Sequence, residues 1–119
     1  MATYSRLLLS GSTSGKPIPV AATATPGTLL HTAVAGATSF DEVYLWASNV
    51  SGAAVLLTVQ WGGVADPSDL LVRQVSIPAN SALVPIALGQ VLNGGLIVRA
   101  FAGTAGDVNI TGYVNRITA

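Results

Sequence analysis

The sequence predicts an all-β fold: a β-sandwich of about eight antiparallel strands, with a jelly roll as one form of it. Three observations predict it. β-Branched residues are frequent, 13 glycines and 6 prolines recur along the chain, and apolar and polar residues alternate between these breaks. A flattened barrel would give the same strand pattern. The 119 residues suit one domain, residues 1–119, without a linker or an internal repeat.

The first twenty residues are expected to be extended, and residues 1–20 are a candidate N-terminal arm. Residues 4–9 predict a short strand, and the Gly- and Ser-rich residues 11–15 predict a loop. Pro17 and Pro19 bias their predecessors away from helix, and proline suits an edge strand better than a central one.

The strongest strand pattern covers residues 41–49. Tyr44 and Trp46 share one face there, opposite alternating apolar residues. Residues 54–61 alternate in the same way. Because only a short turn around Ser51 separates the two segments, they predict a β-hairpin.

The remaining strands follow at similar spacing. They are expected at residues 28–34, 70–77, 82–86, 96–102 and 107–117. Pro85 indicates an edge strand or a bulge. Asn93-Gly94-Gly95 predicts a tight turn, because Asn-Gly accepts positive φ at low cost.

The composition excludes several classes of protein. The chain has no cysteine, which rules out a disulfide scaffold, a zinc finger and an iron–sulfur protein. Five basic residues balance five acidic ones. The basic residues are Arg6, Lys16, Arg73, Arg99 and Arg116, and the acidic residues are Asp41, Glu42, Asp66, Asp69 and Asp107. Five scattered cations form no basic patch, so we expect no nucleic-acid partner.

The small number of charged residues also indicates how the protein functions. Charged residues make up 8% of the chain, against about a quarter in ordinary soluble domains. A folded monomer of this mass exposes roughly 6,000 Å², so the charges are sparse on its surface. We expect another protein to cover part of that surface, in an oligomer or a lattice. Solvation by Thr, Ser, Asn and Gly is the alternative.

No segment predicts membrane insertion or export. Leu7-Leu8-Leu9 is too short for the apolar part of a signal peptide, which needs about 7–15 residues. No stretch approaches the roughly 18 apolar residues of a membrane-spanning helix. We therefore expect no membrane partner and synthesis in a cytoplasm.

No catalytic, cofactor-binding or metal-binding motif stands out, and we expect none of these sites. His31 is the only histidine, and a lone strand histidine is more often structural than catalytic. A Ser-His-Asp triad remains open on composition alone, although no Gly-x-Ser-x-Gly motif occurs. Asp41 and Glu42 are adjacent on a strand and point to opposite faces, so they make a poor acid–base pair. Asp66 and Asp69 are too few for a calcium site.

The aromatic and arginine residues suggest interface roles instead. Trp46, Tyr44, Tyr113 and Trp61 could form a platform for a sugar or a base, but core or interface packing is the preferred interpretation. The Tyr44–Trp46 face must be covered, either inside the sandwich or by a neighbour. Arg99 and Arg116 lie in predicted strands, and we hypothesise that they form ion pairs between subunits. The candidate oligomer or capsid interface residues are Tyr44, Trp46, Arg99, Arg116, Pro17 and Pro19.

The order of segments resembles a known family. The segments are Leu-Ser-Gly-Ser-Thr-Ser-Gly-Lys-Pro-Ile-Pro-Val-Ala-Ala-Thr-Ala-Thr-Pro-Gly (9–27), Asp-Glu-Val-Tyr-Leu-Trp-Ala-Ser-Asn (41–49), Val-Gln-Trp-Gly-Gly (59–63), Asn-Gly-Gly (93–95), Val-Arg-Ala-Phe-Ala (98–102) and Ile-Thr-Gly-Tyr-Val-Asn-Arg-Ile (110–117). Over nearly its whole length the chain resembles small virion proteins of tailed bacteriophages, of the capsid decoration (cement) type.

The resemblance implies a β-sandwich or jelly-roll subunit that assembles as a homo-oligomer, most often a trimer, on the outer surface of a phage head. It implies the major capsid protein as the partner, whose contacts the subunit stabilises, and the virion as the location. Residues 3–20 and the loop 62–69 are candidates for the shell contact. Two alternatives stay open: a tail, neck or fibre component with a receptor- or glycan-binding face, and a small enzyme or lectin-like module outside any virion.

Overall fold

The computed structural model describes residues 2–118, so the first and last residues of the expected domain lie outside the described residues. The described chain forms nine β-strands and no helix. The strands are β1 (Thr3–Leu8), β2 (Ile18–Pro19), β3 (Thr28–Thr32), β4 (Phe40–Asn49), β5 (Val55–Trp61), β6 (Leu70–Ile77), β7 (Val84–Leu92), β8 (Ile97–Ala102) and β9 (Val108–Thr118). The expected all-β fold is confirmed.

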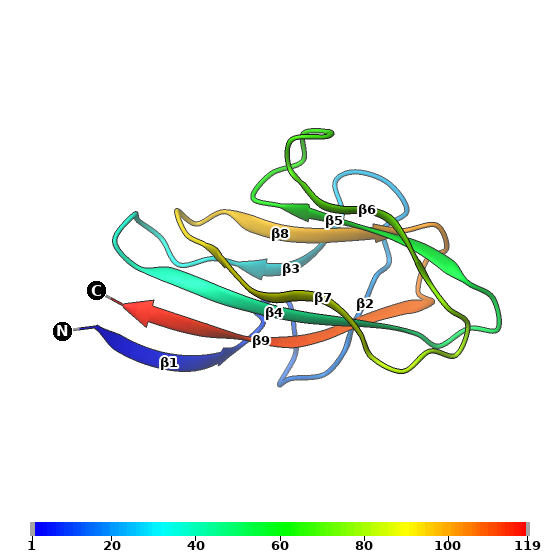
Figure 1. Cartoon of the computed structure of the whole chain (residues 1–119), viewed down its shortest axis with the longest axis horizontal. Coiled ribbons are helices and arrows are strands. Elements are labelled where there is room, and N and C mark those ends of the chain that lie inside the picture. Colours follow the sequence, from blue (N-terminus) through cyan, green and yellow to red (C-terminus); the bar gives the residue numbers. More distant parts are fainter. Residues whose placement is uncertain (1, 119) are drawn as a thin grey trace.

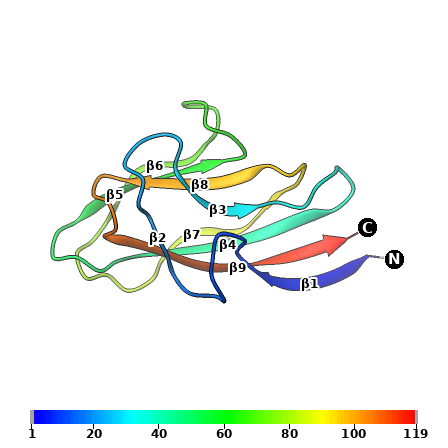
Figure 2. The same cartoon turned by 180° about the vertical axis from the view of Figure 1, so that it is seen from behind.

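The strands form two antiparallel sheets packed face to face, as Figures 1 and 2 show. Sheet A has the order β1-β9-β4-β7, and β2 also pairs with β9. Sheet B has the order β3-β8-β5-β6. The pairings are nested in sequence: β5 pairs with β6, β4 with β7, β3 with β8, and both β1 and β2 with β9. The first and second halves of the chain therefore run antiparallel to each other, as one long hairpin whose strands are divided between the two sheets.

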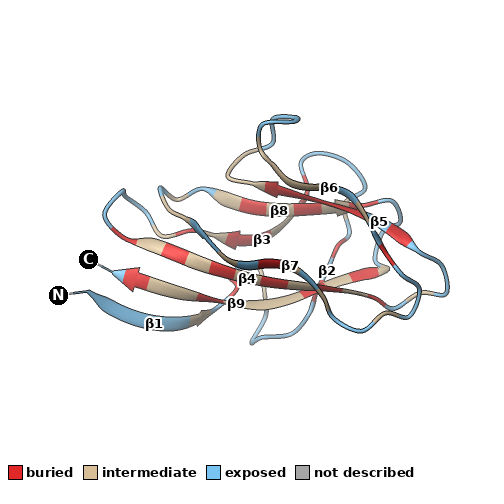
Figure 3. Cartoon of the chain, in the orientation of Figure 1, coloured by how far each residue is buried: buried red, intermediate tan, exposed pale blue. Residues whose placement is uncertain are grey.

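The core lies between the sheets and follows the predicted alternation. In β4 every second side chain, including Val43 and Leu45, is fully buried, and Figure 3 shows this as alternating colours along the strand. Leu57, Val59 and Val98 face them from sheet B with no exposed surface. Such burial is the main favourable contribution to folding, at roughly 25 cal/mol per Å² of apolar surface.

The predicted hairpin of residues 41–49 and 54–61 is wrong. β4 lies in sheet A and β5 in sheet B, so the turn between them carries the chain across the core. The buried Asn49 side chain satisfies the backbone at this crossing. Its Nδ2 donates to the carbonyl oxygens of Ala53 (2.7 Å) and Ile77 (3.0 Å), and its Oδ1 accepts from the backbone N–H of Ser51 (2.9 Å). Alternation identifies the buried face of a strand but not the sheet that it joins.

The expected edge strand around Pro85 is confirmed, but it is longer than residues 82–86. β7 is the outer strand of sheet A, and its register against β4 shifts on either side of the Tyr44 and Leu45 pairs. Gly89 is the extra residue at one shift and has a φ of 96°, which favours glycine. The predicted turn at residues 93–95 is also confirmed, with positive φ at Gly94 and Gly95.

Candidate functional site

The outer face of sheet A, which points away from sheet B, carries a group of exposed apolar side chains. Residues paired across antiparallel strands point to the same side, so the register arranges this face in rows. Two rows cross all four strands in the order β1, β9, β4 and β7: Leu8–Tyr113–Tyr44–Leu88 and Arg6–Asn115–Glu42–Val91. A third row crosses β1, β9 and β4: Tyr4–Ile117–Phe40. A fourth crosses β9, β4 and β7: Thr111–Trp46–Pro85. We call this set of residues the sheet A face.

Three aromatic rings stack at the centre of the sheet A face. The ring centroids of Tyr44 and Tyr113 lie 4.8 Å apart with planes 16° from parallel, and those of Trp46 and Tyr113 lie 6.0 Å apart. The guanidinium of Arg6 lies 4.7 Å from the Tyr113 ring centroid, as a cation–π contact. Gly89 leaves room for the Tyr44 ring, because a Cβ there would lie 3.1 Å from the Tyr44 hydroxyl. The three stacked rings form an aromatic ridge.

Exposed apolar side chains surround this ridge. Tyr4 is 74% exposed, Leu8 55%, Leu88 59% and Val91 53%. β1 is exposed along almost its whole length (Figure 3). Burying such side chains is favourable, by about 1.5–3 kcal/mol for a fully exposed Leu or Val. The sheet A face is therefore a surface that gains free energy when another surface covers it.

The outer face of sheet B is different, because the chain itself covers part of it. Thr58 and Gln60 on β5 are buried, although their neighbours on the strand point into the core. Gln60 Oε1 accepts from the Gly27 backbone N–H (2.9 Å), and Gln60 Nε2 donates to Thr25 Oγ1 (2.8 Å). The segment before β3 thus lies over sheet B, whereas nothing in residues 2–118 covers the sheet A face.

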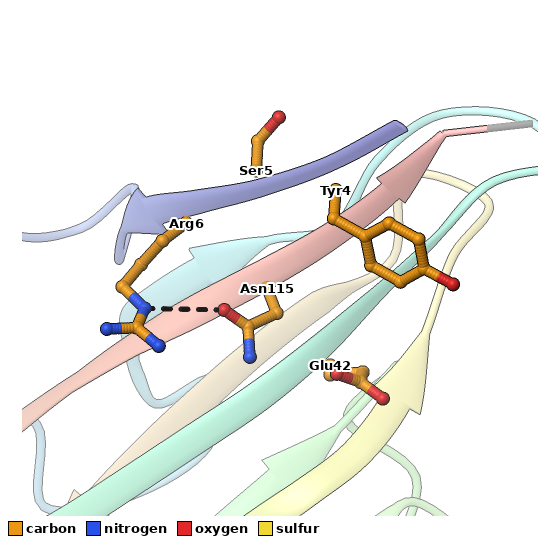
Figure 4. Close-up of a pocket in the computed structure, with 5 residues that line it drawn as sticks. All are labelled: Tyr4, Ser5, Arg6, Glu42 and Asn115. Carbon is orange, nitrogen blue, oxygen red and sulfur yellow. Dashed lines mark hydrogen bonds between the residues drawn. The ribbon is translucent and has the colours of Figure 1, made fainter. Parts of the chain in front are cut away.

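A shallow pocket of about 400 Å³ opens at one end of the sheet A face. Figure 4 shows its lining: Tyr4, Arg6, Asn115 and Glu42 gather on one side, while the side chain of Ser5 points away from them. Arg6 Nε donates to Asn115 Oδ1 at 3.5 Å. Glu42 makes no ion pair within residues 2–118. The pocket therefore presents the Arg6 cation on one side of the Asn115 amide and the Glu42 carboxylate on the other.

A second cluster of ionisable residues is buried at the end of the sandwich. Asp41 has no exposed surface and accepts four hydrogen bonds. Its Oδ1 accepts from Arg116 Nε (2.7 Å), and its Oδ2 accepts from Arg116 Nη2 (3.0 Å), His31 Nε2 (2.8 Å) and the Val34 backbone N–H (3.1 Å). Burial alone would raise the pKa of Asp41, but the hydrogen bonds from Arg116 and His31 outweigh it and hold that pKa below its ordinary value. The hydrogen bond to Asp41 in turn raises the pKa of Arg116.

The geometry around His31 is that of a structural histidine. His31 is 2% exposed, and its Nδ1 accepts from the backbone N–H of Ser10 at 3.1 Å. Both imidazole nitrogens have other partners, the Ser10 backbone N–H and Asp41, while Ser10 Oγ accepts from the Thr32 backbone N–H, so no nitrogen is left to act as the base for that hydroxyl. Ser10, His31 and Asp41 therefore lie together without the arrangement of a catalytic triad.

The structure separates the six interface candidates. Tyr44 and Trp46 lie together on the sheet A face. Arg116 finds its carboxylate, Asp41, within its own chain. Arg99 lies on sheet B, where its Nη1 donates to the Gly27 carbonyl at 3.4 Å. Pro17 and Pro19 are exposed beside the edge of β9 that β2 occupies.

Several residues of the sheet A face were not among these candidates. Tyr4, Leu8, Leu88 and Val91 are single apolar residues in segments whose alternation is weak, so their exposure could not be read from the pattern. Only the strand pairing shows that they share a face with the aromatic ridge. Arg6 and Glu42 join the face for the same reason.

Within residues 2–118, no three His, Asp or Glu side chains gather as a metal site. The same residues contain no helix long and apolar enough to cross a membrane. Comparisons with protein-family models, curated proteins and solved structures give no match.

Proposed function

We propose that this chain is a structural virion protein: a capsid decoration (cement) protein that binds the outer surface of a phage head as an oligomer. In this role it stabilises contacts between major capsid proteins. The observation that carries the proposal is the sheet A face, an uncovered apolar sheet surface on a chain with 8% charged residues. Monomeric proteins rarely leave such a patch exposed unless it binds a partner.

The strand pairing supports the proposal. Nested antiparallel pairs, divided between a five-stranded and a four-stranded sheet, are the arrangement expected of a jelly roll. We therefore infer the jelly-roll form of the sandwich. This architecture recurs in viral capsid proteins and also in lectins, so it agrees with a virion role without requiring it.

The proposed mechanism is burial of surface rather than chemistry. Each apolar contact contributes roughly 25 cal/mol per Å², and copies held together bind a repeating shell with a large gain in effective concentration. The loop from Gly62 to Asp69 projects from the sheet B side, away from the sheet A face (Figure 1). This loop and the N-terminal segment Thr3–Val20 are the candidate contacts with the shell.

The pocket at Tyr4 supports a second candidate function, a glycan- or receptor-binding face on a tail, neck or fibre component. A pyranose ring binds an open aromatic face together with polar groups that hydrogen-bond its hydroxyls, and Tyr4, Arg6, Asn115 and Glu42 supply both. Stacking occupies the facing surfaces of the Tyr44 and Tyr113 rings, so Tyr4 is the main ring open to a sugar. If this function is right, Tyr4→Ala will abolish binding to a glycan array while leaving binding to isolated tails unchanged.

Co-sedimentation tests the decoration role. The purified chain is mixed with expanded and unexpanded heads assembled from the major capsid protein of the same genome. We expect saturable binding to expanded heads and a higher temperature of head disruption. Binding to isolated tails but not to heads would instead support the second candidate.

A further inference from the structure

The sheet A face has the charge pattern of a surface that pairs with a copy of itself. Arg6 and Glu42 flank Asn115 in one row, one strand to either side, and no ion pair joins the two in the described chain. Every other position in the four rows is neutral. When a surface that carries charges pairs with its own copy, complementarity requires both signs in separate places, and this face has one of each.

We propose that the sheet A face binds a second copy of this chain across a twofold axis that runs between β9 and β4. The proposal rests on the proposed function only for the premise that this face is a protein interface, and it names the partner. The axis lies in the interface, parallel to the strands, so that β1 of one copy lies over β7 of the other and β9 lies over β4.

This symmetry matches the rows chemically. Leu8 lies over Leu88 of the other copy, and Tyr113 lies over Tyr44 of the other copy. Asn115 lies over the second Glu42, whose carboxylate its amide can bind. Arg6 comes within one strand spacing, about 4.8 Å sideways, of the same carboxylate, which its long side chain can reach. Both charges of the sheet A face then have partners, and each apolar row meets an apolar row.

The size of the face sets the strength of the pair. Four strands at about 4.8 Å and four rows at about 6.8 Å cover roughly 500 Å² in plan on each copy. Specific interfaces usually bury about 800 Å² on each partner. The pair therefore lies at the weak end of the range and depends on concentration. Its mass is twice 12.0 kDa, which differs from the trimer that the resemblance implies.

Charge reversal on the full chain tests the pairing, with mass measured by light scattering over a range of concentrations. We expect the wild type to approach twice 12.0 kDa. Arg6→Glu and Glu42→Arg should each weaken pairing at least tenfold. The double variant should recover most of the loss, because the two opposite charges then face each other again with their positions exchanged. Arg73→Glu and Asp66→Arg are matched controls on an exposed ion pair away from the face, and they should leave pairing unchanged.

Three results would overturn the inference: a monomer at every concentration, a mass of three times 12.0 kDa, or equal effects of the face and control variants. Circular dichroism confirms that each variant is folded. Head co-sedimentation separates this inference from the proposed function. If Glu42→Arg abolishes head binding but leaves the mass unchanged, the shell is the partner of the face and the pairing is wrong. If the charge reversals change the mass as expected but the wild type does not bind heads, the pairing stands and the decoration role fails.

Discussion

Asp41 shows how a single buried charge is stabilised. It accepts hydrogen bonds from a guanidinium, an imidazole and a backbone amide, and Arg116 is 75 residues away from it in sequence. Strand alternation predicts that Asp41 and Glu42 face opposite ways, and the structure confirms this: one is buried and the other belongs to the sheet A face. No local pattern predicts the partners of Asp41, because contacts between distant strands depend on the whole topology.

Removing the charge of Asp41 should destabilise the fold. In Asp41→Asn, Arg116 loses its counter-charge, and the amide must donate where the carboxylate accepted. The expected loss is about 2–3 kcal/mol, below the 3–5 kcal/mol for fully buried pairs because the Arg116 side chain is 30% exposed. Urea denaturation measures it. Asp66→Asn, which removes an exposed pair, should change stability by less than about 0.5 kcal/mol, and an equal effect of the two variants would contradict the role of burial.

The lowered pKa of Asp41 predicts an acid dependence of stability. A carboxyl whose pKa is lower in the folded state contributes stability above its ordinary pKa of 3.8, and this contribution is lost as the pH falls through the folded value. The difference in unfolding free energy between wild type and Asp41→Asn should therefore be constant above about pH 5 and should narrow below pH 3.8. Urea titrations at several pH values measure this difference. A difference that stays constant down to about pH 2 would show that Asp41 keeps an ordinary pKa.

At the scale of elements, the sequence predicts strands better than it predicts their pairing. The breaks at glycine and proline locate β4, β6 and β8 within a residue or two, because alternation and turn chemistry are local. The assignment of β4 and β5 to one hairpin fails, since a short connection can either turn within a sheet or cross to the other. The buried Asn49 is the sign of a crossing, but it is recognisable only when its hydrogen-bond partners are known.

Gly112 in β9 lies so close to the backbone of β4 that we expect this position not to tolerate a side chain. A Cβ at Gly112 in β9 would overlap the backbone carbonyl oxygen of Tyr44 in β4, and it would lie 3.2 Å from Leu45 Cα. Because the obstruction is backbone in the middle of sheet A, Gly112→Ala should destabilise the protein by about 3 kcal/mol or more. Thermal denaturation measures the effect. Gly52→Ala lies in a turn with open space around it and should be close to neutral.

At the scale of the whole molecule, the two sheets have different outer faces. The chain covers part of sheet B with its own loop through Gln60, whereas the sheet A face carries exposed aromatic and aliphatic side chains. The low charge of the sequence predicts a covered surface somewhere but not its location. That location follows from the strand order, which places the weakly patterned β1 and β7 at either side of the aromatic ridge.

A covered sheet A face predicts that thermal stability depends on protein concentration. Association stabilises the folded chain by mass action, so a hundredfold dilution of a paired protein costs about 1.4 kcal/mol per chain and lowers Tm by up to about 5 °C. Leu88→Lys places a charge on the face at a residue that is 59% exposed in the single chain. It should remove the concentration dependence and leave the Tm of the dilute protein within about a degree, because an exposed substitution changes the monomer little. Scanning calorimetry over that concentration range measures both values. A variant that keeps the full dependence of the wild type would show that the copies associate through another surface.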